Sequence, residues 1–214
     1  MDHQVVENPQ HLEERFEAVV ANPPYSAKWS GDAKFLDDER FSAYGRLAPS
    51  SKADYAFVQH MIHHLDDNGT MAVVLPHGVL FRGNAEAEIR TNLIKRGYIK
   101  AIIGLPANLF YGTGIPACIL VIDKENASER KGIFMIDASK GFIKDGNKNR
   151  LREQDIRKII DVWTDQVETP KFSHFATNEE IEKNEYNLNL PRYIDTSEPE
   201  DMQDIEAHLK GGIP

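Results

Sequence analysis

Short apolar runs alternate along the chain with longer segments whose apolar residues recur at helical spacing. The runs predict buried strands at five places: Phe16–Ala21, Met71–Leu75, Ile99–Leu105, Ala117–Ile122 and Ile133–Ile136. The helical spacing predicts helices at Ala53–Leu65 and Asn84–Arg96. Strands that alternate with helices in this way indicate an α/β fold, in which helices cover both faces of one sheet.

The connections between these elements refine the prediction. Only residues 106–116 separate the third and fourth strands, which is too short for a helical crossover, so these strands should pair antiparallel. Gly69 is expected to cap the end of the first helix, and Asn84 is a candidate N-cap of the second. Residues 26–51 show neither pattern and predict a long polar loop, which in a compact domain is usually functional or mobile.

After residue 137 the pattern changes. Residues 140–152 are basic, which is typical of a DNA-facing segment or of a solvated linker. Residues 151–167 have helical spacing, Thr177–Glu180 resembles a capped helix start, and residues 197–214 are acidic before Gly-Gly-Ile-Pro. We therefore divide the chain into a catalytic part, 1–137, and a helical and irregular extension, 138–214.

Composition limits the class of protein. Of the 214 residues 41% are hydrophobic, enough for the core of one domain, and the single cysteine, Cys118, excludes an intrachain disulfide. No apolar run approaches the roughly 20 residues of a membrane span, and no leader peptide is visible, so we expect a cytoplasmic protein. A net charge of −9 argues against a nucleic-acid surface over the whole molecule but permits a local basic face.

The segment with the clearest chemistry is Asn22-Pro23-Pro24-Tyr25, which directly follows the first predicted strand. Ligands of open α/β sheets bind beyond the carboxyl ends of strands, so an active site is expected here. The Asn22 side-chain oxygen and the Pro23 carbonyl can accept the two hydrogens of one exocyclic amine, while Tyr25 stacks on its ring. These bonds would localise the lone pair of the amine for attack on a methyl donor, without metal or covalent intermediate. The tetrapeptide can also be only a strand-ending turn.

Six segments, including this motif, occur in a specific order. They are Phe16–Trp29, Ala53–Phe57, Leu75–Gly83, Ile103–Phe110, Gly114–Pro116 and Asn187–Tyr193. In this order they resemble the modification subunit of type I restriction–modification systems, an N6-adenine DNA methyltransferase family. The resemblance extends over residues 12–195, and it is specific because of the order rather than because of any one segment.

The resemblance implies a partial Rossmann-like class I methyltransferase sheet with an antiparallel final strand. It implies S-adenosylmethionine as methyl donor and an adenine flipped out of the duplex into a pocket. Asn22 and Pro23 would then accept the amine hydrogens, and Tyr25 would stack on the base. Phe110 is a candidate second aromatic contact, with a core residue as the alternative. The implied partners are DNA and the specificity and restriction subunits of a type I complex.

Several side chains in or near the long loop are candidates for DNA contacts, with a solvated loop as the alternative. They are Lys28, Trp29, Arg46, Ser50, Lys52 and Arg82. His60 and His64 have the spacing of some metal-binding pairs, but no glutamate lies between them in the right pattern, so no metal site is predicted.

The donor site that the resemblance implies lacks its main parts. No glycine-rich loop and acid-ended strand precede Asn22, which remains as the one residue at the edge of the donor site. We therefore expect a fragment, truncated at both ends and inactive alone, whose N-terminal donor-binding strands are missing. Loss of those strands would expose the edge of Phe16–Ala21, which predicts a homodimer or a mobile N-terminus.

Two other functions remain open at this point. The tetrapeptide also suits methylation of a glutamine amide in protein or of an exocyclic amine in RNA. Alternatively, the chain could act without catalysis, as a DNA-binding or assembly module.

Overall fold

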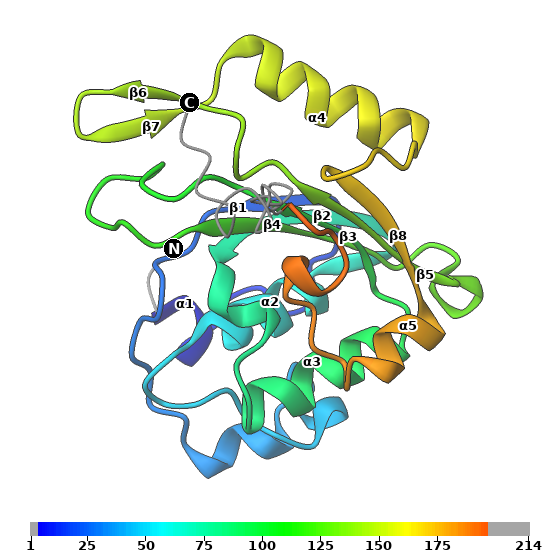
Figure 1. Ribbon diagram of the computed structural model, residues 1–214. Helices are drawn as coiled ribbons and strands as arrows, with labels where there is room; N and C mark the ends of the chain where they lie inside the picture. The colour runs from blue at the N-terminus through cyan, green and yellow to red at the C-terminus, as the bar shows by residue number, and fades with distance from the viewer. Residues whose placement is uncertain (1–3, 197–214) are drawn as a thin grey trace, which may run out of the picture.

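A six-stranded mixed sheet forms the centre of the computed structural model, which describes residues 4–196 (Figure 1). The strands lie in the order β1-β2-β4-β3-β5-β8. Their bounds are β1 Phe16–Ala21, β2 Leu65–Pro76, β3 Ile99–Gly104, β4 Ala117–Asp123, β5 Gly132–Asp137 and β8 Ser173–Thr177. A separate hairpin consists of β6, Ile143–Asp145, and β7, Lys148–Arg150.

The helices lie on both faces of this sheet, as predicted. In Figure 1, α2, α3 and α5 lie on one face, and α4 lies with the β6–β7 hairpin on the other. The α-helices are α1 Gln4–Glu7, α2 Asp54–His63, α3 Ala85–Lys95, α4 Glu153–Asp165 and α5 Asn178–Lys183. Short 3-10 helices are η1 Ala33–Asp37, η2 Ser42–Tyr44, η3 His77–Leu80, η4 Ala127–Glu129 and η5 Leu190–Arg192. None of the helices within residues 4–196 combines the length and the apolar character that a membrane crossing requires.

Strand β4 lies in the interior of the sheet and runs antiparallel to both of its neighbours, β2 and β3. The predicted antiparallel pairing of Ile99–Leu105 with Ala117–Ile122 is therefore confirmed. The pairs β1–β2 and β3–β5 are parallel, which places the carboxyl ends of these four strands at one edge of the sheet. Loops that follow β1 and β3 consequently meet there.

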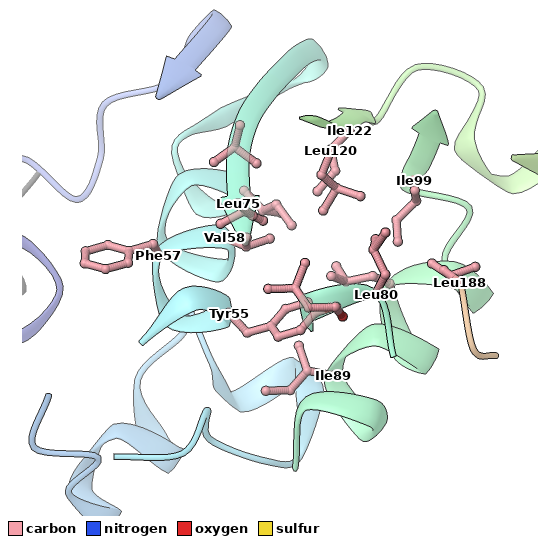
Figure 2. Close-up of a cluster of buried hydrophobic side chains, with 14 of the residues drawn as sticks. Tyr55, Phe57, Val58, Leu75, Leu80, Ile89, Ile99, Leu120, Ile122 and Leu188 are labelled. Carbon is pink, nitrogen blue, oxygen red and sulfur yellow. The ribbon is translucent and has the colours of Figure 1, made fainter. Parts of the chain in front are cut away.

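Two hydrophobic clusters hold the layers together. The larger lies between the sheet and the helices α2 and α3, where Tyr55, Ile89 and Leu120 are buried together (Figure 2). The hydroxyl of Tyr55 donates to the Val79 carbonyl at 2.8 Å, which satisfies a polar group inside this core. The smaller cluster lies under α4, and Tyr25 and Phe110 are among the side chains packed against it.

Strand β1 forms where predicted, but the prediction that it is buried is wrong. Its Val20 side chain is 83% exposed, because β1 is an edge strand paired only with β2 in the described part of the chain. The exposed edge that was expected is present. The homodimer or mobile N-terminus that we expected at this edge stays a prediction.

Two predicted helix caps also differ from the structure. Gly69 lies inside β2 instead of capping α2, and a Cβ atom there would be 2.9 Å from the Phe16 carbonyl, so the close approach of β1 requires glycine. Asn84 precedes α3 with a φ of 54°, but its side chain makes no capping bond. By contrast, the Thr177 hydroxyl accepts from the Glu180 amide at 3.2 Å, which confirms the capped start of α5.

The C-terminal part contains more strand than expected. Residues 140–152, expected to be a DNA-facing segment or a linker, include the β6–β7 hairpin, and α4 confirms the helix predicted after it. Strand β8 pairs with β5 at the edge of the main sheet and was not predicted, since only two of its five side chains are buried. The division at residue 137 stays a prediction. The acidic residues 197–214 lie outside the described residues.

Candidate active site

The loop that follows β1 forms one wall of a pocket of about 460 Å³. The opposite wall is the loop between β3 and β4. The lining residues are Asn22, Pro23, Pro24, Tyr25, Ser26, Phe110, Tyr111, Gly112, Thr113 and Ile115. The fold thus brings the Asn-Pro-Pro-Tyr motif and Phe110 together, although they lie far apart in the sequence.

Tyr25 and Phe110 make the aromatic side of this pocket. Their ring centroids are 6.2 Å apart and the rings meet edge to face at 82°. The Tyr25 hydroxyl is buried and has no hydrogen-bond partner among residues 4–196. Burial, with smaller effects of Cys118 and Asp54, raises the pKa of Tyr25 to about 12. Burial thus further disfavours ionisation of the Tyr25 hydroxyl.

A buried group of charges holds the first loop. The Ser26 amide, directly after Tyr25, donates to Asp54 Oδ1 at 2.7 Å, and Ser26 itself has a φ of 49°. Arg82 Nη1 donates to Asp54 Oδ2 at 3.1 Å and to Glu86 Oε1 at 3.0 Å. Asp54 is 1% exposed and Glu86 3%, and burial raises the pKa of Glu86. Arg82 thus donates to two buried carboxylates, and one of them, Asp54, fixes the backbone beside the motif.

The second loop is held from much further along the chain. Lys148 Nζ in β7 donates to the Phe110 carbonyl at 2.7 Å and to the Thr113 carbonyl at 3.1 Å. The Asn149 side chain donates to the Ala107 carbonyl at 2.6 Å, and its backbone amide donates to the Asn108 carbonyl at 2.9 Å. The β6–β7 hairpin therefore positions the loop that carries Phe110.

The long loop after the motif is ordered around aromatic side chains. The Trp29 amide donates to the Ser50 carbonyl at 2.9 Å, which brings the two ends of the loop together. The Trp29 ring lies 5.4 Å from that of Phe35 and 5.8 Å from that of Phe41, and the side chain is only 5% exposed. The expected DNA contact of Trp29 is therefore corrected to a role in packing this loop.

The other candidates for DNA contact have different surroundings. Arg82 is engaged by the two carboxylates described above, so it is not a free ligand for phosphate. Arg46 is exposed and forms an ion pair with Glu88 at 3.2 Å. Lys28 and Ser50 are exposed and Lys52 is half-buried. These last three stay candidates for DNA contact.

The residues that position both loops were not predicted from the sequence. Asp54 lies within the matched segment Ala53–Phe57, and a charged residue at the start of an otherwise apolar helix was its only signal. Lys148 and Asn149 belong to a basic run whose composition gave no indication of contact with residues 107–113. Both roles depend on contacts between distant segments.

The histidines on α2 are engaged within the protein. Arg40 Nη1 donates to His60 Nδ1 at 3.0 Å, and the His60 and His64 rings lie 4.7 Å apart. In the part of the chain that the structure describes, no group of three or more histidine, cysteine or carboxylate side chains is placed to hold a metal ion.

The residues of the pocket fit a base better than a methyl donor. S-adenosylmethionine has a ribose and a charged amino-acid end, which acidic and other polar side chains ordinarily hold. No charged side chain lines the pocket in residues 4–196. The uncharged lining formed by these residues therefore suits a neutral aromatic ring better than the charged end of a methyl donor, with Asn22 at the edge of the pocket.

This architecture is that of an α/β methyltransferase, in which an antiparallel strand lies inside a mixed sheet and Asn-Pro-Pro-Tyr follows a strand at the carboxyl edge. The chain belongs to the N-6 DNA methylase family, a family of adenine-specific DNA methyltransferases whose model matches residues 2–202.

Curated relatives with similar sequences are methylase subunits of type I restriction enzymes. The chain is 39% identical to the MpnII subunit of Mycoplasma pneumoniae over 197 residues, which are 91% of this chain and 36% of the relative. It is 36% identical to the HindI subunit of Haemophilus influenzae, over 94% of this chain and 48% of the relative. The chain therefore spans between about a third and half of these relatives.

Solved structures of type I methyltransferase subunits also resemble this chain. The type I methyltransferase subunit from Streptococcus thermophilus matches with a TM-score of 0.84 and 47% identity, over 90% of this chain and 41% of that one. The EcoKI M protein matches with a TM-score of 0.64 over 92% of this chain and 47% of that one. At 19% identity this second match shows the fold alone.

Proposed function

We propose that this chain forms the base-binding part of an N6-adenine DNA methyltransferase of a type I restriction–modification system. The observation that carries the proposal is the pocket in which Asn22 and Pro23 face Tyr25 and Phe110 at the carboxyl edge of the sheet. The type I methylase subunits that are 39% and 36% identical to the chain support it.

In this mechanism the pocket binds and orients a flipped adenine. The Asn22 side-chain oxygen and the Pro23 carbonyl accept the two N6 hydrogens, which draws the nitrogen toward tetrahedral geometry and frees its lone pair. Tyr25 and Phe110 hold the ring by aromatic contacts. S-adenosylmethionine supplies the methyl group when it is bound.

The same pocket leads us to infer that the 214 residues do not methylate DNA by themselves. The absence of charged lining residues within 4–196 supports this, because the donor needs further contacts. The complete enzyme would work with DNA and with the specificity and restriction subunits. A role of the isolated chain in binding or assembly alone is favoured by the same observation.

The base pocket can be tested on the chain itself. Adenosine should shift the NMR signals of Tyr25 and Phe110 and bind more tightly than N6,N6-dimethyladenosine, which has no amine hydrogens. Asn22→Ala should abolish this preference, whereas the exposed Asn147→Ala on the hairpin should leave it unchanged. If Asn22→Ala keeps the preference, Asn22 does not accept the amine.

Catalysis requires a second experiment. Methyl transfer from radiolabelled S-adenosylmethionine is measured in the assembled type I complex that contains this segment. Asn22→Ala should remove N6-adenine methylation there, and undiminished transfer would contradict the proposed role. Tight one-to-one binding of the labelled donor by the 214-residue chain would contradict the proposal that this chain lacks the donor site.

A further inference from the structure

A second polar cavity lies at the opposite edge of the sheet, near the amino end of β1 and the carboxyl end of β4. Its volume is about 270 Å³. Three of the cations that line it are Arg15, which directly precedes β1, Lys124, which directly follows β4, and Arg96, which directly follows α3. Strand β1 has six residues at about 3.3 Å each, so roughly 20 Å separates this cavity from Asn22.

Three cations in this cavity are held without a carboxylate. Arg15, Arg96 and Lys124 donate to backbone carbonyls at distances between 2.5 and 3.0 Å. None of the three forms an ion pair within residues 4–196. Burial lowers the pKa of Lys124, the charge of Asp67 raises it, and the smaller effect of Arg15 lowers it. Arg15 and Lys124 therefore repel each other, although Asp67 offsets this repulsion.

The other charged groups of the cavity do not balance these cations. Arg40 is paired with Asp38 at 2.7 Å, and Glu39 lies 3.5 Å from His63. Asp67 is the remaining carboxylate among the lining residues. It acts on Lys124 by raising its pKa, but it forms no ion pair among residues 4–196. Among the lining residues, four arginine and lysine side chains therefore face two carboxylates, Glu39 and Asp67, while Asp66 acts on Lys124 from outside the lining.

Gln59 of α2 adds an unpartnered polar group. The side chain is 0% exposed, and neither its amide nitrogen nor its oxygen has a hydrogen-bond partner among the described residues. Gln59, Ile62 and His63 lie at helical spacing on one face of α2, and all three line the cavity. Buried amides without partners cost free energy, and rotation of the Gln59 side chain toward the cavity would let a ligand satisfy this one.

We propose that this cavity binds a small oxyanion of the phosphate class. Arg15, Arg96 and Lys124 supply the positive charge, and the Gln59 amide donates a neutral hydrogen bond. The separation from the Asn-Pro-Pro-Tyr motif favours a free anion over a backbone phosphate of DNA bound at that motif. The inference does not depend on the proposed methyltransferase function.

The test compares inorganic phosphate with sodium chloride at equal ionic strength, by calorimetric titration and thermal unfolding of the 214-residue chain. Phosphate should bind saturably and raise the melting temperature. Lys124→Met and Arg15→Gln should each weaken phosphate binding by about tenfold or more. Lys144→Met, on the distant hairpin, is the matched control and should leave binding unchanged.

Gln59→Leu gives the sharpest result because it should raise the melting temperature without phosphate but reduce the further rise that phosphate causes. Without phosphate this variant should melt at a higher temperature than the parent, since the unpartnered amide is gone. With phosphate it should gain less than the parent. If Gln59→Leu does not fold, Lys124→Met and Arg15→Gln still decide the question.

Three outcomes overturn the proposal. Equal heats and melting temperatures in phosphate and chloride would show that no oxyanion site exists. Equal effects of Lys124→Met and Lys144→Met would show that the cavity is not the site. Displacement of phosphate by a short DNA duplex would identify the anion as a DNA phosphate instead of a free ion.

Discussion

The two loops that form the candidate active site are held in different ways. The loop at Asn22–Ser26 is fixed by Asp54, a buried carboxylate that pairs with Arg82, and Arg82 also pairs with the buried Glu86. The loop around Phe110 is fixed by a hairpin that is largely exposed, through bonds to its backbone carbonyls. One wall of the pocket thus depends on a buried charge network and the other on contacts that water can partly replace.

This difference has consequences for stability and for motion. Removal of one partner from a buried charge network leaves the other charges without compensation and destabilises the whole fold. Removal of a bond from an exposed hairpin is expected to free only the segment that it holds. The Phe110 wall should therefore open locally while the motif wall stays in place.

The largest effect is expected from Asp54→Ala. It removes two charge-assisted hydrogen bonds, since Asp54 accepts from Arg82 and from the Ser26 amide, so unfolding should require about 3–5 kcal/mol less free energy. Urea denaturation measures this. The control is Asp145→Ala, since Asp145 pairs with Arg150 on the exposed hairpin and should contribute about 0–1 kcal/mol. Equal losses in the two variants would contradict the comparison.

The second-largest expected effect is a loss of stability at low pH, caused by protonation of His60 in α2. Burial, then the charges of His64, Arg40 and His63, lower the pKa of His60 from 6.5 to about 4. Because the folded pKa is the lower one, this stabilisation is complete above pH 6.5 and is lost as the pH falls toward 4. The loss should be about 3 kcal/mol in urea denaturation. His60→Gln should show a flatter pH profile, and an unchanged profile would rule out His60 as the cause.

A smaller effect is expected from Lys148→Met. The variant removes the donor shared by the Phe110 and Thr113 carbonyls, which should cost about 1.5 kcal/mol. Hydrogen exchange should accelerate at the amides of residues 107–113 and stay unchanged at Ser26. Lys144→Met on the same hairpin serves as control. Faster exchange at Ser26 as well would show that the two walls are coupled.

The smallest expected effect is an increase in stability. Tyr25→Phe removes a buried hydroxyl without a partner and should stabilise the protein by up to about 1 kcal/mol. Adenosine binding should persist because the ring remains. Tyr193→Phe is the matched control, since its hydroxyl donates to the Asn187 carbonyl at 2.6 Å and its loss should destabilise. A destabilised Tyr25→Phe variant would indicate that the hydroxyl has a partner in solution.

Much of the fold was predictable because its strands and helices are local patterns. The apolar runs of β3, β4 and β5 are buried on both faces, that of β2 is buried on one face and half-buried on the other, and all four stand out in the sequence. Strand β8 was missed because an edge strand needs few apolar residues. For the same reason β1 was located correctly but its exposure was not foreseen.

The sequence by itself determined the family, the antiparallel pairing of β3 with β4 and the position of Asn-Pro-Pro-Tyr after a strand. These depend on residue order, on loop length and on the short-range rules of secondary structure. The tertiary structure alone decided that Trp29 packs inside a loop, that Arg82 pairs with Asp54 and Glu86, and that the hairpin holds Phe110. The partner of a charged or aromatic side chain depends on which distant segments the fold brings together, and that information is absent from local sequence.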